Sequence, residues 1–218
     1  MTIADYGFAI WETFYVTVLS TAFSLVIGLP LGVLLVAGDK DGILPLPDWL
    51  MHILNIVINI LRSVPFLILM ICVFPLTRAI VGTTVGTKAT IVPLVVAAFP
   101  FVARLVETSL RELDEGVVEA AQSMGATPFQ IITKVMIPEC LPGLISSMTT
   151  ALTTILGYSA MSGVIGGGGL GKIALSYGYY RYQTDIMIVC VILLVLMVQV
   201  FQTLGTAWAT RSDKRLRK

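Results

Sequence analysis

Five long stretches of this sequence carry no charged side chain, and they constrain the fold more than any other feature. They cover residues 13–38, 63–77, 89–103, 140–171 and 186–210. The second run extends backward to Trp49 across one charged residue, Arg62, and the third extends forward past Arg104. A helix that crosses a bilayer needs about 20 mostly apolar residues. We therefore predict an all-α, polytopic membrane protein.

Five transmembrane helices are expected, at about residues 12–37, 52–77, 88–111, 141–163 and 186–208. The runs are long and unbroken, whereas the strands of a membrane β-barrel alternate between apolar and polar residues. Of the 218 residues, 56% are hydrophobic and 12% are charged, which is about half the charge of a typical soluble domain. A soluble enzyme is therefore excluded. The net charge of +1 gives no reason to expect a nucleic-acid partner.

Groups that could carry catalysis or bind a metal are sparse. Cys72, Cys140 and Cys190 lie far apart and form no CxxC motif, so neither a disulfide framework nor a zinc site is indicated. His52 is the single histidine, and no Ser/His/Asp or Cys/His set can be assembled around it. We expect a chain that is not an enzyme and that holds no cofactor or metal of its own.

Basic residues predict which end of the chain faces the cytoplasm, because inner segments of membrane proteins are enriched in Lys and Arg. The 209–218 tail holds five basic residues, whereas the first ten residues hold none. With the tail inside, the inner segments carry nine basic residues and the outer segments carry four. Residues 1–11 are therefore expected outside a cytoplasmic membrane, and residues 209–218 form a basic cytoplasmic tail.

The longest loop, residues 113–139, is expected to fold into two short helices that meet at a sharp bend. Asp114 and Glu115 supply negative charge at the start of the first helix. Gly125 is placed to end it as a left-handed residue. The apolar positions of this helix are Val117, Val118, Ala120, Ala121 and Met124.

The second helix of the loop has its own start signal. Thr127 is followed by Pro128 and by Gln130, which together make a capping box with proline at the first helical position. Pro138 is expected to end the helix. The apolar face is expected to consist of Phe129, Ile132, Val135 and Met136. From these patterns alone, the loop could be a connector that lies on the lipid surface.

The same loop resembles a known family. Glu119-Ala120-Ala121, then Gly125, then Ile137-Pro138 match the EAA motif of permeases of ATP-binding-cassette (ABC) importers of type I. The resemblance implies that residues 12–208 form the transmembrane domain of such a permease. It also implies that the loop is a coupling helix, which docks in a groove of a cytoplasmic ATPase. Glu119 could then fix the bend by hydrogen bonding.

Further segments narrow the resemblance to the methionine-type branch of these permeases. They are Arg62-Ser-Val-Pro-Phe66, Gly82-Thr-Thr-Val-Gly86, Ile91-Val-Pro93-Leu, Ala98-Phe-Pro-Phe-Val-Ala-Arg104, Gly157-Tyr-Ser-Ala-Met161 and Gly167-Gly-Gly-Leu-Gly171. The resemblance implies a homodimer in the bacterial inner membrane, two ATPase subunits that bind ATP and Mg²⁺, and an extracytoplasmic binding protein. Expected cargo is L-methionine, with D-methionine or methionine sulfoxide also possible. A permease for polar amino acids or another small solute is the alternative.

The glycine-rich segment after the fourth span resembles two nucleotide-binding motifs, and both are rejected. Gly166, Gly168 and Gly171 fit G-x-G-x-x-G, and Gly171-Lys172 resembles the end of a P-loop. A P-loop needs Ser or Thr after the lysine, and position 173 is Ile. Both motifs also need a preceding strand, whereas a transmembrane helix precedes this segment. We therefore interpret it as a flexible loop.

Polar side chains within the spans allow two interpretations each. One helix face of the second span holds four polar residues: His52, Asn55, Asn59 and Arg62. This face either lies at the membrane interface, or it faces protein or water, where it would bind another helix or line a transport path. Small hydroxyl residues line one face of the first span and favour close helix packing over cargo binding. These are Thr13, Thr17, Ser20 and Ser24.

The fourth span is the most polar of the charge-free spans, and it follows the coupling loop directly. Its hydroxyl residues predict a helix that lines the transport path, with Thr154, Tyr158 and Ser159 as candidates. Met161 is the candidate gate, because a residue on the axis of a twofold dimer meets its own copy. The alternative is that Met161 is an ordinary core methionine.

Overall fold

The computed structural model describes residues 2–213, and every regular element within this range is helical. Four helices are long and apolar enough to cross a membrane. They are α1 (Ile3–Ala37), α5 (Thr87–Arg111), α9 (Leu141–Met161) and α11 (Thr184–Ser212). These helices lie where the first, third, fourth and fifth spans are predicted, so the all-α membrane fold is confirmed.

The second predicted span is not one helix. In its place the chain forms α2 (Asp48–Ser63), α3 (Phe66–Cys72) and α4 (Phe74–Val81), with a bend of 110° between α2 and α3. Pro65 explains the bend, because a proline lacks the backbone N–H and excludes helical geometry from the residue before it. Val64 accordingly has an extended backbone, with φ −76° and ψ 128°. The expectation of a single helix over 52–77 is therefore wrong: the bent pair of α2 and α3 has the form of a broken span or a re-entrant loop.

The first span packs closely against the third along a stripe of small residues. Gly28 and Gly32 leave room for α5, since a Cβ on Gly28 would come within 2.7 Å of Val102 Cγ1. Ser20 and Ser24 continue the stripe and are fully buried. Small residues four apart let helix backbones approach, which supplies packing energy inside a membrane. The packing interpretation of this helix face is confirmed.

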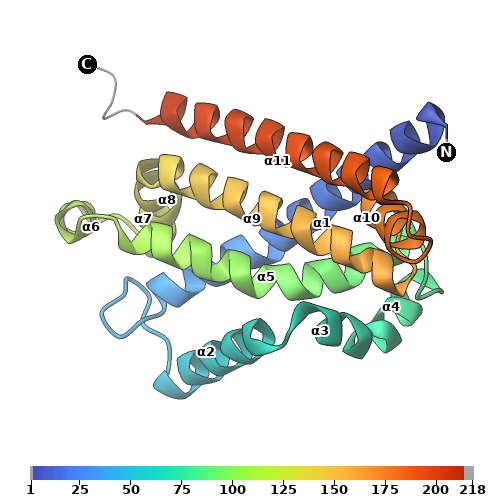
Figure 1. Ribbon diagram of the computed structural model, residues 1–218. Coiled ribbons are helices and arrows are strands. Elements are labelled where there is room, and N and C mark those ends of the chain that lie inside the picture. The colour runs from blue at the N-terminus through green and yellow to red at the C-terminus, as the bar shows by residue number, and fades with distance from the viewer. Residues whose placement is uncertain (1, 214–218) are drawn as a thin grey trace.

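Figure 1 shows how the helices are arranged. Helix α9 packs beside α5, while α11 lies on one side of the bundle and α2 and α3 lie on the other. The 38–47 loop, α6 (Glu115–Ser123), α7 (Pro128–Ile131) and the end of α11 share one end of the molecule. The N-terminus, α4 and α10 (Gly169–Ile173) share the other. The loops that the count of basic residues assigns to the same side of the membrane thus lie at the same end of the molecule. Which of the two ends faces the cytoplasm stays a prediction.

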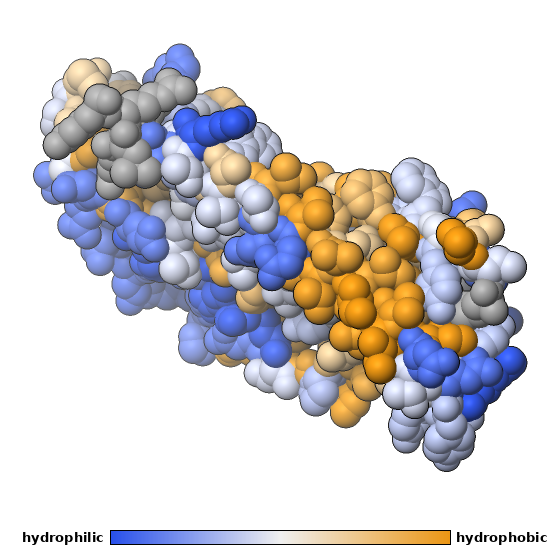
Figure 2. Space-filling model, turned by 45° about the horizontal axis from the view of Figure 1, so that its top comes forward, coloured by the Kyte–Doolittle hydropathy of each residue, from blue (hydrophilic) through white to orange (hydrophobic). Residues whose placement is uncertain are grey.

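The surface of the bundle is apolar around its middle. Figure 2 shows a broad hydrophobic band on one face, with hydrophilic side chains gathered toward the ends. Helix α11 is exposed along most of its length, and only 6% of its most apolar window is buried. Such a surface needs lipid or another protein subunit around it.

The glycine-rich segment is closely packed, which corrects the expectation of a flexible loop. Glu12 of α1 accepts a hydrogen bond from the Gly169 N–H at 2.8 Å and another from the Thr87 hydroxyl of α5. Thr13 accepts from the Leu170 N–H at 2.9 Å. The segment between η2 (Ser162–Ile165) and α10 therefore ties together the ends of α1, α5 and α9. Glycine is needed at position 167, because a Cβ there would lie 2.6 Å from the Ser162 hydroxyl and 2.8 Å from the Ser162 carbonyl oxygen.

Polar residues of α2 bind α5. Arg104 donates hydrogen bonds to Asn55 at 2.6 Å and to Asn59 at 3.1 Å, and it forms an ion pair with Glu107 at 2.6 Å. Glu107 is only 12% exposed and also pairs with Arg111. For Asn55 and Asn59, the interpretation as contacts between helices is therefore confirmed.

Candidate functional site

The 113–139 loop begins with a helix whose ends are both capped. Asp114 accepts a hydrogen bond from the Gly116 N–H at 2.8 Å and starts α6. At the other end Gly125 has φ +76°. The Gly125 N–H donates to the Gln122 carbonyl, and the Ala126 N–H donates to the Ala121 carbonyl. This pair of bonds is a Schellman motif, and it confirms the bend predicted at Gly125.

The second half of the loop also begins as predicted. Thr127 accepts from the Gln130 N–H, and the Gln130 side chain accepts from the Thr127 N–H, which completes the capping box. Helix α7 then continues through a π-helical turn, η1 (Ile132–Met136), into α8 (Ile137–Glu139).

Pro138 does not end this helix, contrary to expectation. It lies in the first turn of α8, and the Ile137 N–H before it donates to the Ile132 carbonyl, five residues back. The wider turn accommodates the proline, which has no N–H to donate and would clash in a regular helix. The chain bends instead at Cys140, immediately before α9. The loop is thereby joined to the fourth span with only one residue between the two helices.

Buried side chains anchor the loop to the bundle. Ala121, Ile131 and Met136 are each less than 5% exposed and pack with Leu110 of α5 and Leu144 of α9. Because a cluster of this kind resists displacement, the orientation of the loop depends on the positions of α5 and α9. A force applied to the loop would reach both helices.

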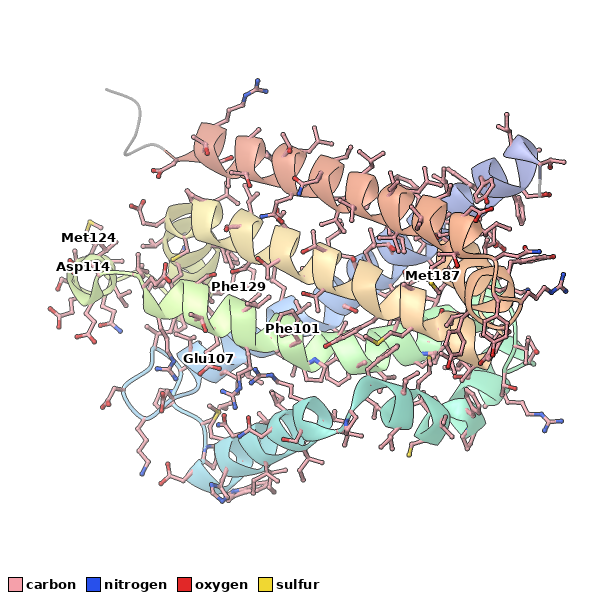
Figure 3. All side chains as sticks on the ribbon, viewed as in Figure 1. Phe101, Glu107, Asp114, Met124, Phe129 and Met187 are labelled. Atoms are coloured by element: carbon pink, nitrogen blue, oxygen red, sulfur yellow. The ribbon has the colours of Figure 1, made fainter. Side chains whose placement is uncertain are left out.

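The opposite face of the loop is exposed and partly apolar. Met124 is 82% exposed and Phe129 is 75% exposed, and Val117, Ala120 and Glu119 also reach the surface. Figures 1 and 3 show α6, with Asp114 and Met124, projecting beyond the ends of the transmembrane helices. Phe129 does not share one apolar face with Ile132, Val135 and Met136 as expected: it lies at the surface, whereas Met136 and the neighbouring Ile131 are buried.

Glu119 does not fix the bend. Within residues 2–213 its carboxylate has no hydrogen-bond partner and is exposed. The backbone bonds around Gly125 hold the bend without it, so the charge of Glu119 is available to a partner protein.

The path candidates divide between two faces of α9. Thr154, Tyr158 and Met161 follow one another at helical spacing and are half-buried or exposed. Ser159 lies on the opposite face, is 5% exposed, and donates a hydrogen bond to the Leu156 carbonyl at 2.7 Å. The structure therefore groups three of the four candidates and separates Ser159 from them.

Arg62 and Asn59 have different surroundings despite their shared helix face. Asn59 binds Arg104, as described above. Arg62 lines a cavity that Tyr158 of α9 also lines, so the structure brings together two residues that the sequence singled out separately. Within the described chain, Arg62 has no ion-pair partner. Among residues 2–213, no three His, Cys, Asp or Glu side chains gather as a metal site.

Sequence reasoning missed the ion-pair cluster at the loop end of α5. Arg104, Glu107 and Arg111 are spaced three and four residues apart, and Arg111 also pairs with Asp39 at 2.8 Å. The helical spacing is a usable signal for the first three residues. Asp39, 72 positions away in the chain, could be found only from the tertiary structure.

Comparison with known sequences agrees with the geometry. Residues 28–218 match the family model described as the inner membrane component of binding-protein-dependent transport systems. A probable D-methionine transport system permease protein of Vibrio cholerae is 51% identical over 95% of this chain and 92% of its own length. The D-methionine transport system permease protein of Escherichia coli K12 is 49% identical over 71% of this chain and 70% of its own length.

Solved structures give the same result. The chain superimposes on a subunit of the MetNI methionine ABC transporter in an inward-facing conformation with a TM-score of 0.95 and 43% identity, covering 98% of this chain and 100% of the other. An amino-acid ABC transporter solved with histidines has a TM-score of 0.77 at 19% identity, with 94% and 93% coverage, and shares the fold. With the EAA motif on a projecting loop of this fold, the chain belongs to the family of inner membrane components of binding-protein-dependent transport systems.

Proposed function

We propose that the chain is the membrane-spanning subunit of an importer for methionine, including the D-isomer. The observation that carries this proposal is identity near 50% to methionine permeases over almost the entire chain. The relationship to the transporter solved with histidines extends to the fold only, so it does not favour a polar amino acid as cargo.

Energy for transport is supplied by a partner, in this proposal. Two copies of a cytoplasmic ATPase bind ATP and Mg²⁺, and each receives one α6 loop in a groove. Met124 and Phe129 supply apolar contact area, while Glu119 supplies a charge at the rim. Closure of the ATPase pair on ATP then moves α5 and α9 through the buried cluster around Leu110 and Leu144.

Two copies of the chain form the path between them, in this proposal. The face of α9 that holds Thr154, Tyr158 and the exposed Met161 lies toward the twofold axis, and the two Met161 side chains close the resting path. A binding protein delivers cargo at the end that holds the N-terminus and α10. The basic tail is cytoplasmic; its residues 214–218 lie outside the described residues.

Reconstituted uptake tests the proposal. The chain is copurified with its ATPase, placed in proteoliposomes with ATP inside, and supplied with binding protein and radiolabelled L-methionine, D-methionine, histidine or glutamine. We expect uptake of methionine that requires ATP and is competed by methionine alone. Uptake of histidine or glutamine in preference to methionine would overturn the cargo assignment.

The gate has a separate test. A Met161→Cys pair should form a disulfide between subunits in the resting state, and Met161→Ala should raise ATP hydrolysis without cargo. Val164→Cys, on an exposed residue three positions along the chain, is the control for random collision. No crosslink together with unchanged hydrolysis would return Met161 to a packing role.

A further inference from the structure

A small cavity lies where the bent pair of α2 and α3 meets α5 and α9. Its volume is about 190 Å³, and Arg62, Phe66, Ala97, Phe101 and Tyr158 are among the residues that line it. The cavity is partly open to its surroundings, and this space is enough for several waters or a small solute. Phe101, labelled on α5 in Figure 3, lines the cavity together with Leu61 of α2 and Leu69 of α3.

The cavity lies near the middle of the membrane-spanning region. Ala97 and Phe101 flank residue 99, the midpoint of α5 (Thr87–Arg111). A guanidinium at this depth is costly, and ionisable groups there usually face a water-filled path or a bound partner. No carboxylate of the described chain lies within ion-pair distance of Arg62. The charge of Arg62 is therefore available for an anionic group of a ligand.

The remaining lining of the cavity is largely apolar, and three of its residues are aromatic: Phe66, Phe101 and Tyr158. Phe66 and Tyr158 stack with ring centroids 4.6 Å apart and planes 7° apart, which joins the start of α3 to α9. Aromatic faces attract ammonium groups and polarizable thioether sulfur. None of the described residues that line the cavity is acidic. The lining therefore suits a ligand with one carboxylate, one ammonium group and an uncharged side chain.

Resting on the function proposed above, we propose that this cavity is a cargo subsite within the permease, in which Arg62 binds the carboxylate of the amino acid. The aromatic wall of Phe66, Phe101 and Tyr158 then contacts the ammonium group and the side chain. A planar guanidinium binds a carboxylate through two parallel hydrogen bonds, which lysine cannot reproduce. The site lies beside Thr154 and Tyr158 on α9, so cargo would meet it on the path.

A local measurement tests the subsite without depending on transport. Ala97→Cys is introduced together with Cys72→Ser, since Cys72 is the exposed native cysteine and Cys140 and Cys190 are buried. The variant is assembled with its ATPase, and modification of the introduced thiol by a small methanethiosulfonate reagent is timed. L-Methionine should slow this modification about fivefold or more, because a bound ligand of this size covers most of the cavity wall. Ala79→Cys, on the exposed side of α4, should show no protection.

The role of Arg62 is tested by comparing protection by methionine with protection by an analogue that lacks the carboxylate. L-Methioninamide, which lacks the carboxylate, should need a roughly tenfold or higher concentration to give the same protection. Arg62→Gln should remove this difference between methionine and its amide, and Arg62→Lys should reduce it. Arg78→Gln, an exposed arginine on α4, should leave both protection and uptake unchanged. Methionine and its amide can be compared in the variant that keeps Arg62. This comparison therefore tests the proposal even if the Arg62→Gln chain does not assemble with its ATPase.

The outcomes separate this inference from the proposed function. Equal modification of the Ala97→Cys thiol with and without methionine, in a complex that imports methionine, would overturn the subsite and leave the function intact. Equal protection by methionine and its amide would overturn the role of Arg62. Absence of methionine uptake by the unmodified complex would overturn the proposed function itself.

Discussion

Gly125 holds a backbone conformation that other residues adopt with difficulty. Its φ is +76°, and a Cβ placed there would meet nothing within 4 Å, so any penalty comes from the backbone alone. A left-handed conformation costs an L-residue roughly 1–2 kcal/mol, most for β-branched side chains.

Gly125→Val should therefore unfold the bend and abolish ATPase association, while the transmembrane helices remain assembled. Gly125→Asn is the matched control, because asparagine tolerates positive φ and should retain most activity. Copurification of the ATPase and uptake measure the effect. Wild-type behaviour of Gly125→Val would refute a docking role for this bend.

Gly171 is required for a different reason, close contact between two backbones. A Cβ on Gly171 would overlap the Ala160 carbonyl and lie 2.6 Å from Ala160 Cα. Neither atom belongs to a flexible side chain, so relief requires a shift of α10 against α9.

Gly171→Ala should lower stability by about 1–3 kcal/mol, the usual cost of overpacking. Gly157→Ala provides the control, because its Cβ would meet nothing within 4 Å and alanine favours helix. Thermal unfolding of the detergent-solubilised chain gives the comparison. A melting temperature for Gly171→Ala equal to that of wild type would mean that the contact is looser than the structure shows.

Helices α1 and α5 are joined at the loop end by charged residues. The Arg111 guanidinium donates a hydrogen bond to Asp39 and holds the pKa of that carboxyl below its usual value, and a bond from the Lys40 N–H acts in the same direction. A carboxyl whose pKa is depressed by folding stabilises the protein above the unfolded pKa, about 3.9 for Asp, and loses that contribution as pH falls through the folded pKa.

Asp39→Asn should therefore lower the melting temperature between about pH 5 and pH 8 and should make little difference below about pH 3. Asp41→Asn, an exposed neighbour with no ion pair within the described residues, should change little at any pH. Added salt should reduce the effect of Asp39→Asn, because the pair is half exposed. A difference that grows toward acid pH would contradict the assignment.

At the scale of the whole molecule, the two ends differ in what they hold. One end carries the 113–139 loop and the end of α11, and the other carries the N-terminus and the tight glycine segment. Lys172→Cys should react with an impermeant thiol reagent from outside intact cells. Arg211→Cys should react only after the membrane is opened. Labelling of Arg211→Cys from outside would reverse the predicted orientation.

Much of the architecture could be predicted from the sequence, because local rules and the lipid environment decide it. Long apolar runs must form helices in a membrane, since every backbone polar group needs an internal partner there. The caps at Asp114 and Thr127 and the bend at Gly125 depend on residues within a few positions of each other. These features do not need knowledge of the remaining chain.

Contacts between distant segments were decided by the tertiary structure. No local pattern around Glu12 indicates that its carboxylate binds the Gly169 N–H, 157 positions away, so the sequence predicts a flexible loop where the structure holds a packed one. The break at Pro65 has a local cause, yet its consequence, a cavity shared by Arg62 and Tyr158, depends on how α2 and α9 pack. The physical reason is that local sequence sets backbone geometry, whereas packing and charge pairing are properties of surfaces that meet only after folding.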